Sequence, residues 1–206
     1  MRKRIFLIDA MAQIYRAHFA MSRNPLFTSK GENVSAIYGF TNILMSLITR
    51  EKPDLLAVVY DSPQPTFRHY LHSEYKATRD KMPEELARQL QRLDQILKAL
   101  GLVKIILPGY EADDLVGVLA KRADQMGYEV FLVTGDKDYY QLVNENIHFY
   151  NIKGGVDNPE ILDPQGVQRV FGVPPEQVID VLALAGDSSD NVPGVPKVGI
   201  KTAINC

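Results

Sequence analysis

Short apolar segments that end at an acidic residue place the tightest constraint on the fold of this chain. Residues 4–9 and 55–61 are two such segments, and the same arrangement recurs at 103–111 and 129–136. Segments with helical periodicity separate them, and this alternation predicts a parallel sheet covered by helices on both faces. Ligand sites in such sheets lie beyond the carboxyl ends of the strands. We therefore expect the four acidic ends to converge in space.

The predicted elements follow one another regularly up to about residue 145 and change character after it. Residues 62–82 show little apolar periodicity and form a long excursion, and 147–162 forms a small β excursion with a glycine turn. Short helices begin near 163 and 174, and 192–203 is typical of a helix, a glycine-bearing hairpin and a second helix. The remaining strands are expected at 4–9, 55–60, 103–107 and 129–133, and the remaining helices at 11–21, 34–50, 83–100 and 113–127.

The composition is that of an ordinary globular protein. Of the 206 residues, 46% are hydrophobic and 23% are charged, which is enough apolar material for one α/β domain with a core. No apolar stretch has the length of a membrane span, so no membrane partner is expected. The single cysteine, Cys206, excludes an internal disulfide and fits a reducing, cytoplasmic setting. The net charge of −2 argues neither for nor against nucleic acid.

Nine carboxylates form the strongest functional signal. Such a group is costly to bring together unless cations hold it, and oxygen-rich acidic sites suit Mg²⁺ or Mn²⁺. Two such ions roughly 4 Å apart are the usual means of cleaving phosphodiesters. Helix caps and solvated turns explain any one acid equally well, but they do not explain the whole set on one sheet edge. The nine candidates are Asp9, Asp61, Glu111, Asp113, Asp114, Asp136, Asp138, Asp187 and Asp190.

The excursion after Asp61 carries a second signal. Arg68, Lys76 and Arg79 alternate with aromatic residues including Tyr75, and cations interleaved with rings suit single-stranded nucleic acid. Local composition by itself favours a solvated surface loop. Its place directly after an acidic strand end favours a lid over an active site.

The segment 192–203 carries a third signal. Its glycine-bearing hairpin and the following helix start would present backbone N–H groups to phosphate, and Lys197 and Lys201 add positive charge. A plain helix–helix connection is the alternative. A monovalent cation on the hairpin carbonyls is a further hypothesis that spacing alone does not decide.

Seven short stretches occur in order along nearly the whole chain: Leu7-Ile8-Asp9, Thr66-Phe67-Arg68, Tyr75-Lys76-Ala77-Thr78-Arg79, Glu111-Ala112-Asp113-Asp114, Thr134-Gly135-Asp136-Lys137-Asp138, Gly186-Asp187-Ser188-Ser189-Asp190-Asn191 and Val198-Gly199-Ile200-Lys201-Thr202-Ala203. With them the chain resembles the 5′–3′ exonuclease domain of bacterial DNA polymerase I, within the flap endonuclease family. The resemblance implies a PIN-like parallel sheet flanked by helices, with a helical arch and a helix–three-turn–helix DNA-binding element. It implies a catalytic domain over 1–163, an arch near 62–82, and an incomplete helix–hairpin–helix region over 164–206.

The resemblance also implies roles for these residues. Lys76 and Arg79 would act beside the scissile phosphate, with Tyr75 available to stack on a base and Arg68 on the same DNA-binding segment. The hairpin would grip duplex DNA with a bound K⁺ through Gly194, Lys197, Gly199, Lys201 and Thr202. The first metal would be held by Asp9, Asp61, Glu111 and Asp113, and the second, directly or through water, by Asp114, Asp136, Asp138, Asp187 and Asp190.

The implied reaction is removal of 5′ nucleotides, flaps and RNA primers from nicked or branched DNA during replication and repair. We expect a monomer in the bacterial cytoplasm, associated with the nucleoid. A polymerase domain fused in the full gene is a further hypothesis that the sequence does not decide. A PIN-like ribonuclease and a non-catalytic DNA-binding remnant are the alternatives. The hairpin argues against the first, and the presence of all nine acids argues against the second.

The chain departs from the family pattern at two places. Ala10 stands where the family usually has glycine, and we expect the extra methyl group to be tolerated. The chain ends at Cys206, inside the second hairpin helix. We expect it to keep the metal site but to be less stable, and to bind DNA less well, than a complete domain.

Overall fold

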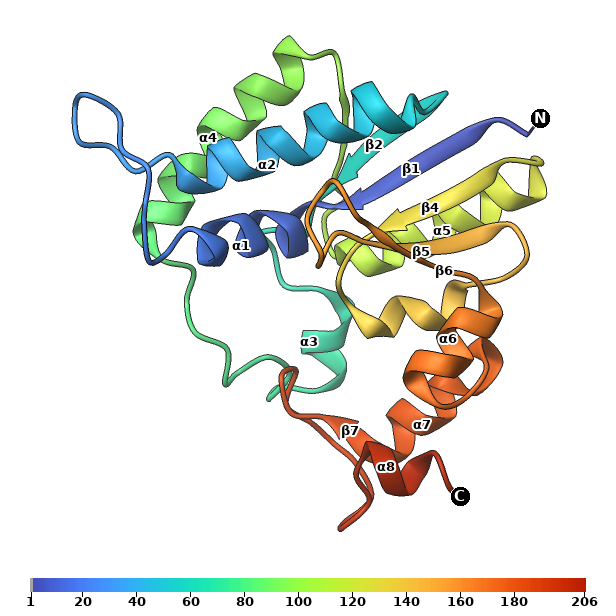
Figure 1. The fold of residues 1–206 in the computed structure, drawn as a ribbon. Coiled ribbons are helices and arrows are strands. Elements are labelled where there is room, and N and C mark those ends of the chain that lie inside the picture. Colours follow the sequence, from blue (N-terminus) through green and yellow to red (C-terminus); the bar gives the residue numbers. More distant parts are fainter. Residues whose placement is uncertain (1) are drawn as a thin grey trace.

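A six-stranded sheet forms the centre of the computed structural model, which describes residues 2–206 (Figure 1). The strand order is β3-β2-β1-β4-β5-β6; the first five strands are parallel and β6 is antiparallel to β5. The predicted α/β fold with a mostly parallel sheet is therefore confirmed. The strands are β1 (Arg4–Asp9), β2 (Leu55–Val59), β3 (Val103–Ile105), β4 (Glu129–Val133), β5 (Ile147–Asn151) and β6 (Glu160–Leu162).

The central strand β1 explains why its sequence is apolar without interruption. Phe6, Leu7 and Ile8 are at most 1% exposed. Leu7 belongs to the core on one face of the sheet, whereas Phe6 and Ile8 belong to the core on the other. Side chains alternate across a strand, so a strand covered on both faces needs apolar residues at every position.

Helices cover both faces, as Figure 1 shows. Helices α1, α2 and α4 pack on one face and α5 packs on the other, followed by α6 and α7 of the C-terminal part. The α-helices are α1 (Ala10–Ala20), α2 (Ser35–Ser46), α3 (Phe67–Leu71), α4 (Glu84–Ala99), α5 (Ala112–Gln125), α6 (Pro164–Phe171), α7 (Val178–Ala185) and α8 (Ile200–Ala203). No helix within residues 2–206 is long and apolar enough to cross a membrane.

Three elements differ in detail from the sequence-based expectation. The helix expected over 34–50 changes into the π-helical turn η1 (Leu47–Glu51), which ends at Lys52 in the left-handed conformation. The strand expected over 103–107 stops at Ile105, because only three of its residues pair with β2. The β excursion over 147–162 is part of the main sheet, since β5 pairs with β4 along four residues.

The C-terminal segment forms a hairpin between two helices. After α7 the chain makes a two-stranded ribbon of β7 (Gly186–Asp187) and β8 (Val192–Pro193), and it then turns into α8. Gly186 and Gly194 meet where the ribbon closes, and a Cβ atom on Gly186 would lie 2.2 Å from the Gly194 nitrogen. Only glycines allow this contact, so they determine where the two ends of the ribbon come together.

Candidate active site

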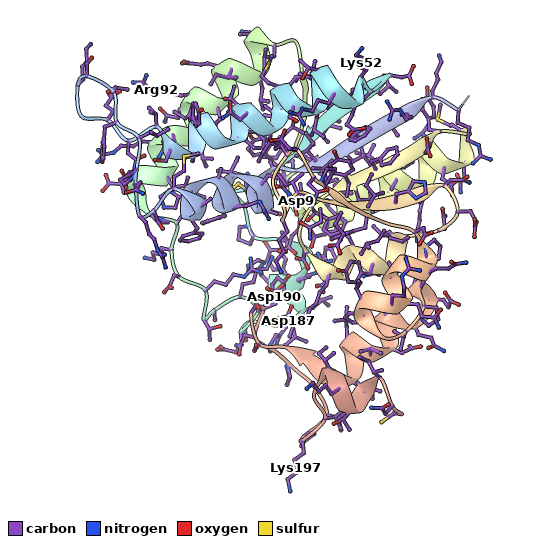
Figure 2. All side chains as sticks on the ribbon, in the orientation of Figure 1. Asp9, Lys52, Arg92, Asp187, Asp190 and Lys197 are labelled. Atoms are coloured by element: carbon purple, nitrogen blue, oxygen red, sulfur yellow. The ribbon has the colours of Figure 1, made fainter. Side chains whose placement is uncertain are left out.

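Seven of the nine predicted acids line one cavity of about 670 Å³ beyond the carboxyl ends of the strands. Strand β1 ends at Asp9, while Asp61 and Asp136 follow β2 and β4. Figure 2 shows Asp9 at the centre of the molecule, with Asp187 and Asp190 on the C-terminal segment below it. The predicted convergence is therefore seen for these acids: Asp9, Asp61, Asp113, Asp136, Asp138, Asp187 and Asp190.

Asp9 serves as a helix cap and as a wall of the cavity. Its Oδ1 atom accepts a hydrogen bond of 3.1 Å from the Ala12 N–H, which caps α1. Its Oδ2 atom accepts one of 3.2 Å from the Thr134 hydroxyl. Burial, helped by the charges of Asp113 and Asp61, raises the pKa of Asp9 to about 7. Asp9 thus caps the helix, and a nearby cation would in addition stabilise its ionised form.

Asp113 and Asp138 are the other acids with clearly raised pKa values. Burial raises the pKa of Asp113 to about 6, and the charges of Asp136 and Asp61 raise it further, while the hydrogen bond from Tyr139 opposes the shift. Burial and the charges of Asp136 and Asp187 raise the pKa of Asp138 to about 6. Burial is the largest cause of both shifts, and the charges of the neighbouring carboxylates add to it.

Glu111 and Asp114 line a neighbouring cavity of about 850 Å³. Glu111 is 5% exposed, and its Oε1 atom accepts a hydrogen bond of 2.7 Å from the Lys76 ammonium. Both oxygens of Asp114 accept from the Arg68 guanidinium at 2.8 Å. Although burial raises it, the hydrogen bonds from Arg68 leave the pKa of Asp114 below its usual value. Asp114 is therefore already neutralised by an arginine.

The segment 72–79 lies across the cavity and is tied to the turn that contains Asp190. The Lys76 N–H donates to the Asp190 carbonyl at 2.9 Å, and the Asn191 side chain donates to the Glu74 carbonyl at 2.8 Å. Arg79 forms an ion pair with the Asp190 carboxylate. The predicted lid thus touches the C-terminal ribbon directly.

Tyr75 occupies a different place from the one its expected stacking role requires. The residue is 7% exposed, and its hydroxyl oxygen lies 2.9 Å from Glu111 Oε2 and 2.8 Å from Asp190 Oδ2, within hydrogen-bond distance of both. Its ring meets the His69 ring edge-on, with centroids 5.2 Å apart. The tyrosine therefore joins two acids in this state, and its ring would have to turn outward to meet a base.

The acids do not form a finished metal site. Within residues 2–206, no group of three or more His, Cys, Asp or Glu side chains stands in a geometry that holds a metal ion. Lys76, Arg68 and Arg79 neutralise three of the acids instead. The donors are nevertheless all carboxylates, and Asp9, Asp113 and Asp138 repel their neighbours. This donor set fits a hard divalent cation.

The predicted duplex-binding residues lie outside the acidic cavity. Lys197 has a positive φ of 67° and points away from the body of the molecule at the hairpin tip (Figure 2). Gly199 precedes α8, and the Thr202 N–H donates to its carbonyl at 2.9 Å. Gly194 closes the ribbon, and the Lys201 side chain is exposed on α8. None of these residues lines the acidic cavity, whereas Asp187 and Asp190, which lie earlier in the same segment, do line it.

Family models account for the chain from residue 4 to its end. Residues 4–172 match the 5′-3′ exonuclease N-terminal resolvase-like domain, and residues 173–206 match the 5′-3′ exonuclease C-terminal SAM fold. The chain belongs to the 5′-3′ exonuclease family. The resemblance that the motifs indicated is confirmed, and with it the assignment to an enzyme family of nucleases.

Individual relatives show how much of a longer protein the chain matches. It is 43% identical to a 5′-3′ exonuclease of Aquifex aeolicus over 98% of this chain and 68% of that protein. It is also 43% identical to DNA polymerase I of Bacillus subtilis, of which it covers 23%. A bacteriophage T5 flap endonuclease solved with DNA and metal ions shares its fold, with a TM-score of 0.78 and 20% identity over 98% of this chain and 74% of that one.

Sequence reasoning missed one residue of this exonuclease's site. Tyr139 is 2% exposed, and its hydroxyl donates to Asp113 Oδ1 at 2.7 Å. It follows directly on the acidic motif that ends at Asp138, in the 3₁₀ turn η2 (Lys137–Leu142). Its position next to Asp138 could have indicated a place in the site, but a tyrosine there is equally typical of a core residue.

The raised pKa values predict an unusual pH dependence of metal-free stability. Folded Asp9, Asp113 and Asp138 hold their protons at higher pH than in the unfolded chain, where the aspartate pKa is about 3.9. Between about pH 4 and 7 the folded state binds more protons, so the free energy of unfolding falls as pH rises. We expect the melting temperature in EDTA to be several degrees higher at pH 5.5 than at pH 8.

Thermal melts at the two pH values, with EDTA or with 10 mM MgCl₂, measure this effect. Because a cation bound among ionised carboxylates stabilises the folded state, Mg²⁺ should raise the melting temperature more at pH 8 than at pH 5.5. A melting temperature in EDTA that increased from pH 5.5 to pH 8 would contradict the prediction.

Proposed function

We propose that this chain hydrolyses phosphodiester bonds at the 5′ ends of DNA, using two divalent cations held by the acidic cavity. The observation that carries the proposal is the gathering of seven carboxylates at one sheet edge, with Lys76 and Arg79 beside them. Membership of the 5′-3′ exonuclease family supports it. The sharing of a fold with a flap endonuclease solved with DNA and metal ions also supports it.

The two groups of acids assigned from the resemblance would hold Mg²⁺ or Mn²⁺. Asp9 and Glu111 are the most buried of them, at 6% and 5% exposed. Asp61 accepts the Ala112 N–H at 2.8 Å, which fixes its place at the start of α5. Asp114 would act through water, because Arg68 occupies both of its oxygens. When bound, the cations would lower the pKa of a water molecule and stabilise the leaving oxygen.

The positively charged side chains near the cavity would act on the phosphate. The Lys76 ammonium lies 2.7 Å from Glu111 and 3.8 Å from Asp190, between the two cavities. A phosphodiester that enters the acidic cavity would meet Lys76 and Arg79, which would offset the charge that develops on the phosphate oxygens. The ties between 72–79 and the Asp190 turn would have to loosen as the strand enters.

The C-terminal hairpin would bind duplex DNA away from the reaction centre. Lys197 and Lys201 would face the phosphate backbone, and the carbonyls of 194–199 would hold a K⁺ ion. We propose the division into 1–163 and 164–206, in which the second part carries Lys197 and Lys201 and also contributes Asp187 and Asp190 to the acidic cavity. The substrates we propose are 5′ flaps, nicked or branched duplexes and RNA–DNA junctions, cut by a monomer in the bacterial cytoplasm at the nucleoid. A fused polymerase is proposed from the relatives that carry one.

The decisive experiment is cleavage of a 5′-flap duplex labelled at its 5′ end, with MgCl₂ or with EDTA. We expect short labelled products with Mg²⁺ and none with EDTA, and little cleavage of a blunt duplex of the same sequence. A chain that binds the flap duplex in a gel-shift assay but releases no product with Mg²⁺ or Mn²⁺ would be a DNA-binding remnant, and the proposal would be wrong.

A further inference from the structure

Tyr139 lies between two acids that come from different elements. It belongs to η2, whereas Asp113 stands in the first turn of α5 and Asp9 ends β1. Its hydroxyl oxygen is 2.7 Å from Asp113 Oδ1 and 3.4 Å from Asp9 Oδ2. The ring is 2% exposed and packs in the core on the α5 side of the sheet. A rigid aromatic side chain thus brings one hydroxyl to the meeting point of two carboxylates.

The distances decide how that hydroxyl is used. A phenol has one proton to donate, and the shorter contact directs it to Asp113, because a donor to a carboxylate normally lies within about 2.7 Å. Asp9 keeps its own donors, Ala12 and Thr134. The other oxygen of Asp113 accepts no hydrogen bond from any residue of 2–206. Asp113 therefore presents one fixed oxygen and one free oxygen.

Tyr139 differs from the acids around it, since a phenol hydroxyl can donate a hydrogen bond to a carboxylate and is not itself a carboxylate.

We propose that Tyr139 is a positioning residue that holds Asp113 beside Asp9, so that both carboxylates face the space a divalent cation would fill. This inference rests on the proposed function. Without the hydroxyl, the Asp113 carboxylate could rotate about its side-chain bonds. Each binding cation would then have to restrict that rotation, which would weaken binding. Mutation of a residue that hydrogen-bonds to a metal ligand typically lowers metal affinity by about 10- to 100-fold.

The test compares Tyr139→Phe with Tyr140→Phe in the full chain. The first variant removes one oxygen atom and keeps the ring. Tyr140 is the matched control, because its ring packs edge-on against Phe149 and Phe171 and does not line the acidic cavity. Mn²⁺ binding to the metal-free protein is measured by calorimetry with MnCl₂ as titrant. Flap cleavage is measured as a function of MnCl₂ concentration, and melting temperature is recorded in EDTA.

We expect Tyr139→Phe to weaken Mn²⁺ binding about 10-fold and to raise the half-saturating MnCl₂ concentration for cleavage by the same factor. The rate at saturating MnCl₂ should stay within about 3-fold of the wild-type rate, because the ligands themselves are intact. Tyr140→Phe should match the wild type in both. Unchanged Mn²⁺ affinity in Tyr139→Phe would overturn the inference while leaving the proposed function in place. Failure of the wild-type chain to bind Mn²⁺ at all would overturn the proposed function, and this inference with it.

Discussion

Replacing Asp113 with asparagine is expected to remove at least 99.9% of flap cleavage and, at the same time, to raise the melting temperature of the metal-free protein. Cleavage should fall about 10³-fold, because metal-ion catalysis supplies several kcal/mol of transition-state stabilisation. Stability should rise by a few degrees at pH 8, because Asp113 is a half-buried carboxylate beside the charges of Asp136 and Asp61 and its pKa is raised to about 6. Asparagine has the same shape and can still accept the Tyr139 hydroxyl.

Single-turnover cleavage of the labelled flap duplex and thermal melts in EDTA measure the two effects. Asp180→Asn is the matched control: this aspartate is exposed on α7, and its replacement should change neither quantity. DNA affinity in EDTA should be close to that of the wild type in both variants. Reduced stability of Asp113→Asn in EDTA would show that the acids do not repel one another as inferred.

Replacing Lys76 with alanine is expected to slow cleavage by about 10²-fold, with little change in DNA affinity. Removal of one preorganised positive group at a reacting centre typically costs this much, and the hairpin residues proposed to bind duplex DNA lie elsewhere. The effect on stability should be opposite to that of Asp113→Asn. The change removes the 2.7 Å ion pair of Glu111, which is 5% exposed, and leaves it only the 3.5 Å pair with Arg68. A buried charge that loses its nearest partner destabilises the fold. The backbone at residue 76 keeps its positive φ of 56° in both forms, so no new strain enters.

The same flap assay, an equilibrium binding assay in CaCl₂ and thermal melts in EDTA measure the three quantities. Lys30→Ala, in the exposed loop before α2, is the control for loss of a lysine. Mg²⁺ should raise the melting temperature of Lys76→Ala by more than it raises that of the wild type, because the metal cation then replaces the missing ammonium group. Equal losses of DNA affinity and of cleavage rate would point to a role for Lys76 in binding alone.

The opposite stability effects of these two substitutions follow from one property of the site. The metal-free acids are balanced partly by the chain's own cations, through Lys76 on Glu111, Arg68 on Asp114 and Arg79 on Asp190. Removing a negative charge relieves repulsion, and removing a positive charge increases it. Two of these pairs, those of Lys76 and Arg79, also hold the segment 72–79 across the cavity.

Local sequence was a good guide to the framework. The apolar segments at β1, β2 and β4 predicted buried strands because a two-sided sheet leaves no polar positions in its central strands. It was a weaker guide at the edges. Strand β3 ends two residues early because pairing with β2 stops, and β5 joins the sheet because β4 offers it a free edge. Neither event has a signal within the segment itself.

By itself, the sequence determined the α/β class, the alternation of strands and helices, the family and the sheet edge at which the acids gather. These depend on short-range patterns and on the rule that parallel strands place their carboxyl ends together. Only the tertiary structure decided which cation faces which acid, that Tyr75 joins Glu111 to Asp190, and that Tyr139 holds Asp113 beside Asp9. These contacts join residues 26 to 115 positions apart. Their partners are chosen by packing between elements, which no local pattern records.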